Sequence, residues 1–369
     1  MKKEIFAAVA MAVMLVAAAS CKHDGGEPDY SEGELSSVTV RIAGEDSRAP
    51  STDDLTQAQE STIKNYTVLV FNYATGKLEG MAISNDPTTP VTVDNLLNIG
   101  AKRIVIVANT SSAMGFPVMT VGTSNYSALS SSHFTLDYQK TIRQDVIDNG
   151  LVMTGEYPDA VMLNPKPAAN LITVTIRRIV AKLVLGSITV GEANDDISMF
   201  SIKGVTIQQA NSQSNFSTGD PATGGDQWGG LIGTGTTATK SYLYNNITAL
   251  ASTIVAGDPT TFGNFFYVFP NAAANPVKLC IHATYDYNDG GGAHTVYFPI
   301  KINDLDDGDA TIGTIDGTYV TRNVKYIVNI HIRNPGNGSN DPDAVPAEAD
   351  CVVTVQTEDW ATITQNTEW

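Results

Sequence analysis

Histidine, serine and acidic side chains build most catalytic and metal sites, and in this sequence none of them has a diagnostic spacing. The 369 residues contain no GxSxG elbow, no HExxH pair, no Walker loop and no GxGxxG turn after a strand. The histidines lack ligand-like spacing, and His282 and His294 are interpreted as flanking a hairpin rather than binding zinc. The five histidines are His23, His133, His282, His294 and His331. We therefore expect no metal, no cofactor and no enzymatic activity.

An acidic segment, NDLDDGDATIGTIDG at 303–317, could in principle hold calcium. Its glycine comes one position too early for an EF-hand loop that starts at Asp304, and we interpret the segment as a solvated turn. The other candidate ligands are Asp306, Asp307 and Asp309. A carboxylate pair for glycoside hydrolysis is set by space rather than by sequence, so this alternative stays open, although nothing selects one pair.

One arginine stands alone in an acidic segment near the N-terminus. Arg48 is the only base between Arg41 and Lys64, in the acidic, polar stretch AGEDSRAPSTDDL. Flexible polar loops of this kind are where proteases act. From the residues alone, Arg48 is interpreted as a solvated charge in a loop that a protease could reach.

The N-terminus carries an export signal and a candidate acylation site. Lys2 and Lys3 precede an apolar run to residue 20, which is typical of a secretory signal peptide over residues 1–20. The small residues before Cys21 resemble the lipobox of bacterial lipoproteins, in which the cysteine is acylated after cleavage. An ordinary cleavage site beside a chance cysteine is the alternative. Residues 21–36 are polar and contain glycine, so they suit a tether between an outer-membrane lipid and a folded body.

Composition and charge exclude some classes of protein. The formal net charge of −17 and the absence of a Lys/Arg cluster argue against a nucleic-acid partner. After residue 20 no apolar stretch reaches the roughly 20 residues that a membrane-spanning helix needs. The other two cysteines, Cys280 and Cys351, either pair in an oxidising compartment or stay as free buried thiols.

The pattern of the chain predicts an all-β fold. Alternation in SSVTVRIA at 36–43 places Val38, Val40 and Ile42 on one face and leaves Thr39 and Arg41 on the other. Further strands are expected at 65–73, 102–109, 171–190, 265–271, 277–302, 323–333 and 351–360. Many short strands with frequent turns bury one face each, which favours antiparallel β-sandwiches with few short helices. We expect an N-terminal domain at 37–185 and a C-terminal domain at 186–369.

Several stretches together resemble the FimA-type fimbrillins, the lipoprotein precursors of type V pili in anaerobic Gram-negative bacteria. The resemblance lies in their order along nearly the whole chain rather than in any one of them. The matching stretches are the lipobox ending in Cys21, SVTVRI, EDSRAP, RRIVAKL, FYVFPN, the hairpin after it, RNVKYIVNIHI and the last strand with Trp360. The resemblance implies two transthyretin-like sandwiches in tandem and a fimbrial shaft subunit that supports cell adhesion.

The resemblance also implies how the subunit assembles. An arginine-specific protease would cut between Arg48 and Ala49, and the loss of residues 21–48 would remove the lipid together with the first strand. Removing an edge strand leaves unpaired backbone groups and an apolar groove, which an added segment can fill. A neighbour's residues 346–369 are the expected donor, with Cys351, Val353 and Val355 on one face. Subunits joined in this way form a homopolymer at the cell surface, together with accessory fimbrial subunits.

Two alternatives follow from the same sequence. A tip subunit would lack a usable donor strand and an anchor subunit would keep its lipid, whereas this sequence has candidates for both the donor strand and the cleavable arginine. The other alternative is a surface glycan-binding lipoprotein or hydrolase, with aromatic residues such as Trp228 lining a sugar site. We expect Trp228, in GGDQWGG, to lie at the tip of a loop or in a family-variable insertion.

Overall fold

The structure is a computed structural model, and it confirms the all-β prediction. It describes residues 35–43, 57–111, 114–135, 146, 148–165, 170–191, 197–216, 226–230, 238–246, 258–271, 275–287, 291–302, 320–334, 341 and 350–359. Within this part of the chain the helical elements are short: α2 (Gln57–Glu60), α3 (Tyr126–Ser130) and the 3-10 turn η5 (Ser241–Leu243). Among the described residues, no helix has the length and apolar character to cross a bilayer.

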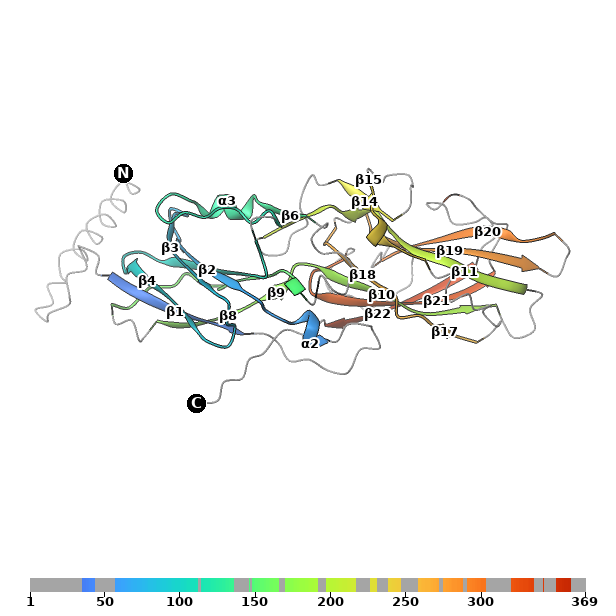
Figure 1. Cartoon of the computed structure of the whole chain (residues 1–369), viewed down its shortest axis with the longest axis horizontal. Helices are drawn as coiled ribbons and strands as arrows, with labels where there is room; N and C mark the ends of the chain where they lie inside the picture. Colours follow the sequence, from blue (N-terminus) through green and yellow to red (C-terminus); the bar gives the residue numbers. More distant parts are fainter. Residues whose placement is uncertain are drawn as a thin grey trace, which may run out of the picture. The chain divides into compact units, whose positions relative to one another are not determined.

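The first strand belongs to a three-stranded sheet with the order β4-β1-β8 (Figure 1). Its members are β1 (Leu35–Ala43), β4 (Val91–Leu97) and β8 (Leu171–Thr175). β1 runs antiparallel to β4 and parallel to β8. The register between β1 and β4 shifts between Ser36 and Val38, beside Asn95 of β4, which has a φ of 59°. Asparagine tolerates this left-handed conformation better than most residues, so it suits a bulge.

A second sheet of five strands, in the order β3-β2-β5-β7-β9, supplies much of the apolar surface of the same half of the chain. The strands are β2 (Tyr66–Asn72), β3 (Leu78–Ser84), β5 (Lys102–Ala108), β7 (Met153–Glu156) and β9 (Arg177–Arg178). β2 and β5 are nearly all buried because their Val, Ile, Leu and Phe side chains lie at the centre of the sheet. Gly80 of β3 lies directly against Val93 and Leu96 of β4, so the two sheets meet there.

Two further sheets are formed by the later part of the chain. The first has the order β17-β10-β21-β22, with β18 also pairing with β10; the second has the order β16-β11-β19-β20. The strands of the first are β10 (Ala181–Val190), β17 (Thr260–Thr261), β18 (Phe265–Val268), β21 (Val324–Asn334) and β22 (Asp350–Asp359). Those of the second are β11 (Ile197–Gln208), β16 (Tyr244–Asn246), β19 (Lys278–Tyr287) and β20 (His294–Lys301). β19 and β20 form the hairpin that the sequence predicts.

Small strand pairs complete the described structure. They are β12 (Ala210–Asn211), β14 (Gln227–Gly229) and β15 (Ala238–Thr239) in one sheet, and β6 (His133–Thr135) with β13 (Gln213–Asn215) in another. The pairing of β6 with β13 joins segments about 80 residues apart in sequence. The predicted domain boundary between residues 185 and 186 falls inside β10, and the division into two domains stays a prediction.

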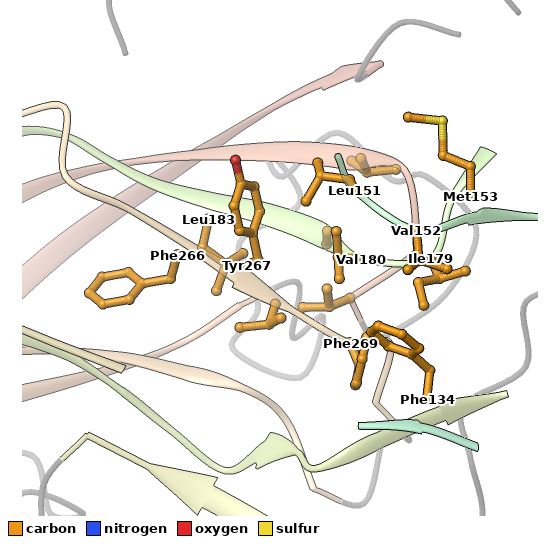
Figure 2. Close-up of a cluster of buried hydrophobic side chains, with 14 of the residues drawn as sticks. Phe134, Leu151, Val152, Met153, Ile179, Val180, Leu183, Phe266, Tyr267 and Phe269 are labelled. Carbon is orange, nitrogen blue, oxygen red and sulfur yellow. The ribbon is translucent and has the colours of Figure 1, made fainter. Parts of the chain in front are cut away.

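One buried cluster connects segments that are far apart in sequence (Figure 2). Phe134 of β6 and Phe269, just after β18, meet edge to face with ring centroids 6.1 Å apart. Leu151, Val152 and Met153 come from the chain around β7 and are almost fully buried with Phe134 and Phe269. These contacts hold β7 and the strands that follow residue 180 in one core.

Candidate functional site: the first strand and the groove that holds it

β1 is a central strand, and the expectation of an edge strand was wrong in this respect. It is paired on both sides, from Leu35 to Val40 with β4 and from Thr39 to Ala43 with β8. The alternation along β1 predicts which face is buried, but it does not predict which strands lie beside β1. The neighbour β8 is far from β1 in sequence. Removal of β1 would therefore leave two strand edges facing each other across an open groove.

The inward face of β1 is apolar and closely packed. Val38 and Val40 are fully buried and Ile42 is 7% exposed, as the alternation of the sequence predicts. Burial of each such side chain contributes about 1.5 to 3 kcal/mol before the entropy of ordering is subtracted. Because Val38 and Val93 are register partners, they share the groove with β4. The apolar side chains of β1 therefore fill the groove, and a replacement strand would need apolar side chains at the same positions.

The start of β1 is held by two asparagines, which we call the asparagine clamp: Asn164 and Asn170. The hydroxyl of Ser36 donates to the carbonyl of Asn164 at 2.7 Å and accepts from Asn170 Nδ2 at 3.0 Å. The same Nδ2 donates to the carbonyls of Ser37 at 2.9 Å and Asn164 at 2.8 Å. Asn170 Oδ1 accepts from the Asn164 amide. Ser36 and Asn170 are 4% and 6% exposed, so the clamp is a nearly dry polar contact at the end of an apolar groove.

The outward face of β1 is polar. Thr39 and Thr92 form a cross-strand pair with their hydroxyl oxygens 3.0 Å apart. The amide of Thr39 donates to the carbonyl of Asn170, so the clamp also meets the backbone of β1. Arg41 is opposite Thr173 of β8. This face contributes polar contacts between neighbouring strands rather than apolar burial.

The loop after β1 lies outside the described residues, and so do the candidate cleavage residues Arg48 and Ala49 and the candidate lipidation residue Cys21. The described chain resumes at α2, whose last residue is Glu60. Glu60 is 2% exposed, and its carboxylate accepts from Lys182 Nζ at 2.7 Å and from the Tyr267 hydroxyl at 2.6 Å. The chain that follows the loop is therefore fixed by a buried ion pair to β10 and a hydrogen bond from β18.

Arg178 completes this polar junction. Its guanidinium donates to the Glu60 carbonyl at 3.1 Å, to the Ser61 hydroxyl at 2.6 Å and to Asn323 Oδ1 at 3.1 Å. Burial lowers the pKa of Arg178 to about 10, and the nearby Glu60 carboxylate opposes this shift. The structure buries Arg178 and Lys182, and it pairs Lys182 with Glu60, a partner that no sequence pattern indicated.

The candidate donor strand is β22 at the edge of its sheet. It runs antiparallel to β21 from Val324↔Asp359 to Asn334↔Asp350, and in the described chain no strand pairs with its other side. Cys351, Val353 and Val355 lie in this strand, and their side chains are outside the described part of the structure. Residues 346–349 and 360–369 of the proposed donor are also outside it.

The structure also bears on the predictions for Trp228, Cys280 and His282. Trp228 is not at a loop tip: it lies in β14, is 9% exposed and packs under Lys240, whose Nζ is 3.9 Å from the indole ring. Cys280 is fully buried in β19, with its thiol 3.9 Å from the carbonyl oxygen of Ile281, and its pairing with Cys351 stays a prediction because the Cys351 side chain lies outside the described part of the chain. The ring of His282 stacks on Tyr297 of the hairpin at 4.6 Å. The acidic segment at 303–317 lies outside the described residues, within which no group of three or more potential ligands could hold a metal ion.

Comparison with protein-family models identifies the family of this chain. The model of the family "Major fimbrial subunit protein (FimA)" matches residues 36–229. The chain belongs to this family. A model of the C-terminal domain of FimA-like major fimbrial subunit proteins matches residues 184–360, so the two models together extend from the start of β1 to the end of β22. A search of curated proteins gave no match.

Solved structures show the same fold. The chain is similar to a fimbrilin (FimA) from Porphyromonas gingivalis W83, with 20% identity, a TM-score of 0.64 and coverage of 90% of this chain and 99% of the other. A candidate cell adhesion protein from Bacteroides eggerthii DSM 20697 is similar at 20% identity and a TM-score of 0.64, with 90% and 98% coverage. This FimA-family chain is thus a structural fimbrial subunit of the cell surface, a class of protein that is not enzymatic.

Proposed function

We propose that this FimA-family protein is a shaft subunit that polymerises by exchange of β1 for a strand of a neighbouring subunit. It is exported as a precursor, lipidated on Cys21 in the outer membrane, and cut between Arg48 and Ala49 by an arginine-specific protease. Residues 21–48 then leave with the lipid and β1. The C-terminal segment 346–369 of the next subunit takes the place of β1, and repetition of this contact builds an open filament that supports adhesion.

The observation that carries the proposal is the position of β1. It is a buried strand between β4 and β8, and it is followed by the polar segment that contains Arg48. β1 is connected to the rest of the described chain only through this segment, so one cut separates it covalently from the fold. Hydrogen bonds and burial alone then hold β1 in place, and these are the same interactions that another strand can supply.

The fixed position of Glu60 supports the same mechanism. A cut at Arg48 creates a new N-terminus at Ala49, eleven residues before Glu60. Because the Glu60 carboxylate is paired with Lys182 and Tyr267, the new end stays attached to the core while β1 departs. The chain downstream of the cut is thus anchored independently of β1.

The proposal is tested by treating purified precursor with an arginine-specific protease. We expect a product whose N-terminal sequence starts at Ala49, followed by a ladder of oligomers that resists mild SDS. Arg48→Gln should block both the new N-terminus and the ladder, and Arg41→Gln, which alters the other arginine near the loop, serves as the control. A product that starts at Ala49 and stays monomeric would contradict strand exchange, and cleavage that is unaffected by Arg48→Gln would contradict the processing site.

A further inference from the structure

We propose that the asparagine clamp sets the register and direction of the incoming strand, which is residues 351–357 of a second copy of this chain, running opposite to the β1 that it replaces. This inference rests on the proposed strand exchange. It adds a specificity determinant, the pair Asn164 and Asn170, and it assigns Thr357 of the donor to the place of Ser36.

The groove demands a definite pattern of side chains. From the clamp onward, the inward positions of β1 hold a hydroxyl at Ser36 and apolar groups at Val38, Val40 and Ile42, with exposures of 4%, 0%, 0% and 7%. The central outward position holds Thr39, whose hydroxyl meets that of Thr92. A replacement strand that satisfies the groove therefore needs a short donor-acceptor side chain at one end and three apolar side chains at alternate positions after it.

The C-terminal strand carries this pattern only in reverse. Read backward from Thr357, the alternate residues are Val355, Val353 and Cys351, which correspond to Val38, Val40 and Ile42. The outward residue between the two valines is Thr354, which corresponds to Thr39. The reversed segment thus reproduces the hydroxyl at the clamp, the three apolar side chains on the floor and the threonine opposite Thr92.

The forward direction fits less well. The triplet Val-Thr-Val occurs in both segments, at 38–40 and 353–355, so it can be superimposed in either direction. The forward direction would place Cys351 at the clamp and Thr357 in the site of Ile42. A thiol is a weak hydrogen-bonding group, and a threonine hydroxyl in an apolar site would be buried without a partner. Both ends of the segment therefore favour the reversed direction.

The hydrogen bonds of the clamp explain why the end of the strand at the position of Ser36 determines the direction of the donor. When β1 leaves, Asn170 Nδ2 loses its contacts with the Ser36 hydroxyl and the Ser37 carbonyl, and the Asn164 carbonyl loses the Ser36 hydroxyl. If an apolar side chain closed over these groups, they would be buried without those partners, which is strongly unfavourable. A slip of one residue would also turn the apolar side chains of the donor toward solvent.

The proposed direction is tested by disulfide cross-linking in the polymer. Arg41 is opposite Thr173, so the reversed donor places Val352 beside Thr173, whereas a forward donor places Gln356 there. Precursors with Thr173→Cys and either Val352→Cys or Gln356→Cys are prepared in a Cys351→Val background, cut at Arg48, polymerised and oxidised. Cys280 is kept because it is buried. We expect a covalent ladder without reductant for the Val352→Cys pair and not for the Gln356→Cys pair.

The other outcomes separate this inference from the proposed function. A covalent ladder for the Gln356→Cys pair overturns the proposed direction. An SDS-resistant polymer that neither pair cross-links overturns the register and leaves strand exchange standing. If the cut background protein forms no polymer, strand exchange itself is contradicted and the register fails with it.

The role of the clamp is tested with variants of the donor and of β1. We expect Thr357→Val to shorten the half-life of the polymer in mild SDS about tenfold, since one buried donor loses its partner. Thr357→Ser should preserve the half-life, and the outward substitution Thr354→Val is the matched control. Ser36→Ala should lower the melting temperature of the precursor and leave the polymer unchanged, because residue 36 has been removed from it. A polymer half-life unaffected by Thr357→Val would overturn the assignment.

Discussion

At the scale of single residues, the carboxylate of Glu60 is the centre of the polar junction after the loop. Lys182 and Tyr267 both donate to its Oε1 atom, and all three residues are at most 2% exposed. Taking two charges out of water carries a large desolvation penalty, so the ion pair adds little net stability over an apolar pair of the same size. Removal of one member of the ion pair, however, leaves the other member buried without its partner.

The first prediction concerns this pair. Glu60→Gln should lower the free energy of unfolding by about 3 to 5 kcal/mol, because the buried ion pair with Lys182 loses its negative partner. The double variant Glu60→Leu/Lys182→Met should recover most of that loss. Urea unfolding of the precursor measures both. A Glu60→Gln variant within about 0.5 kcal/mol of the wild type would show that the junction is open to water.

A second residue-scale prediction concerns Tyr126. Burial, followed by the hydrogen bond to Glu156 Oε2 at 2.8 Å, raises the pKa of Tyr126 to about 12, although Arg103 opposes the shift. Since the folded-state pKa is above the ordinary value of 10.0, this group's contribution to stability is fully present below pH 10 and is lost as pH rises toward 12.

Tyr126→Phe should therefore make the urea midpoint of the precursor fall less steeply above about pH 10 than it does in the wild type. The exposed Tyr73→Phe is the control, because Tyr73 is 48% exposed. Equal slopes for wild type and Tyr126→Phe would show that Tyr126 titrates near its ordinary pKa.

At the scale of elements, the groove depends on close contact between β3 and β4. A Cβ atom added at Gly80 would lie 2.6 Å from side-chain atoms of both Val93 and Leu96. These two residues line the β4 side of the groove, and Val93 is the register partner of Val38. A side chain at Gly80 would have to displace them, so the shape of the groove depends on a glycine outside it.

Gly80→Ala should destabilise the precursor by about 1 to 3 kcal/mol through overpacking, and it should slow polymer formation because β4 is displaced. Thermal unfolding and the SDS ladder measure the two effects. Ile83→Ala, a substitution at a 65% exposed position of the same strand, is the control. Full stability of Gly80→Ala would mean that Val93 and Leu96 move without penalty.

At the scale of the whole molecule, each subunit of a strand-exchange polymer gives one strand and receives another. The receiving groove lies between β4 and β8, and the proposed donor contains β22, which pairs on one side only in the described chain. The two ends of one subunit are different surfaces, so the contact between copies is heterologous and does not close on itself. Filament growth therefore requires both surfaces on every internal subunit.

Truncation of the C-terminus tests the donor strand separately from the receiving groove. Removal of residues 360–369 should preserve polymerisation, because 351–357 is the segment inferred to enter the groove. Removal of 350–369 should give a subunit that receives but does not give, and its addition to intact cut subunits should shorten the polymers in SDS gels. Since that deletion also exposes the edge of β21, circular dichroism must first show that the variant folds. Polymers of full length with either truncation would place the donor elsewhere.

The sequence by itself determined the all-β class, the buried face of the first strand and the family, because strand alternation and the order of the family-like stretches along the chain are local or sequential properties. Tertiary structure alone decided that β1 is central, that Trp228 is buried and that Glu60 pairs with Lys182. The asparagine clamp was likewise invisible in sequence, since Ser36 and Asn170 are 134 residues apart. Alternation reports which side of a strand is dry, whereas the partners of a strand are set by how distant segments pack.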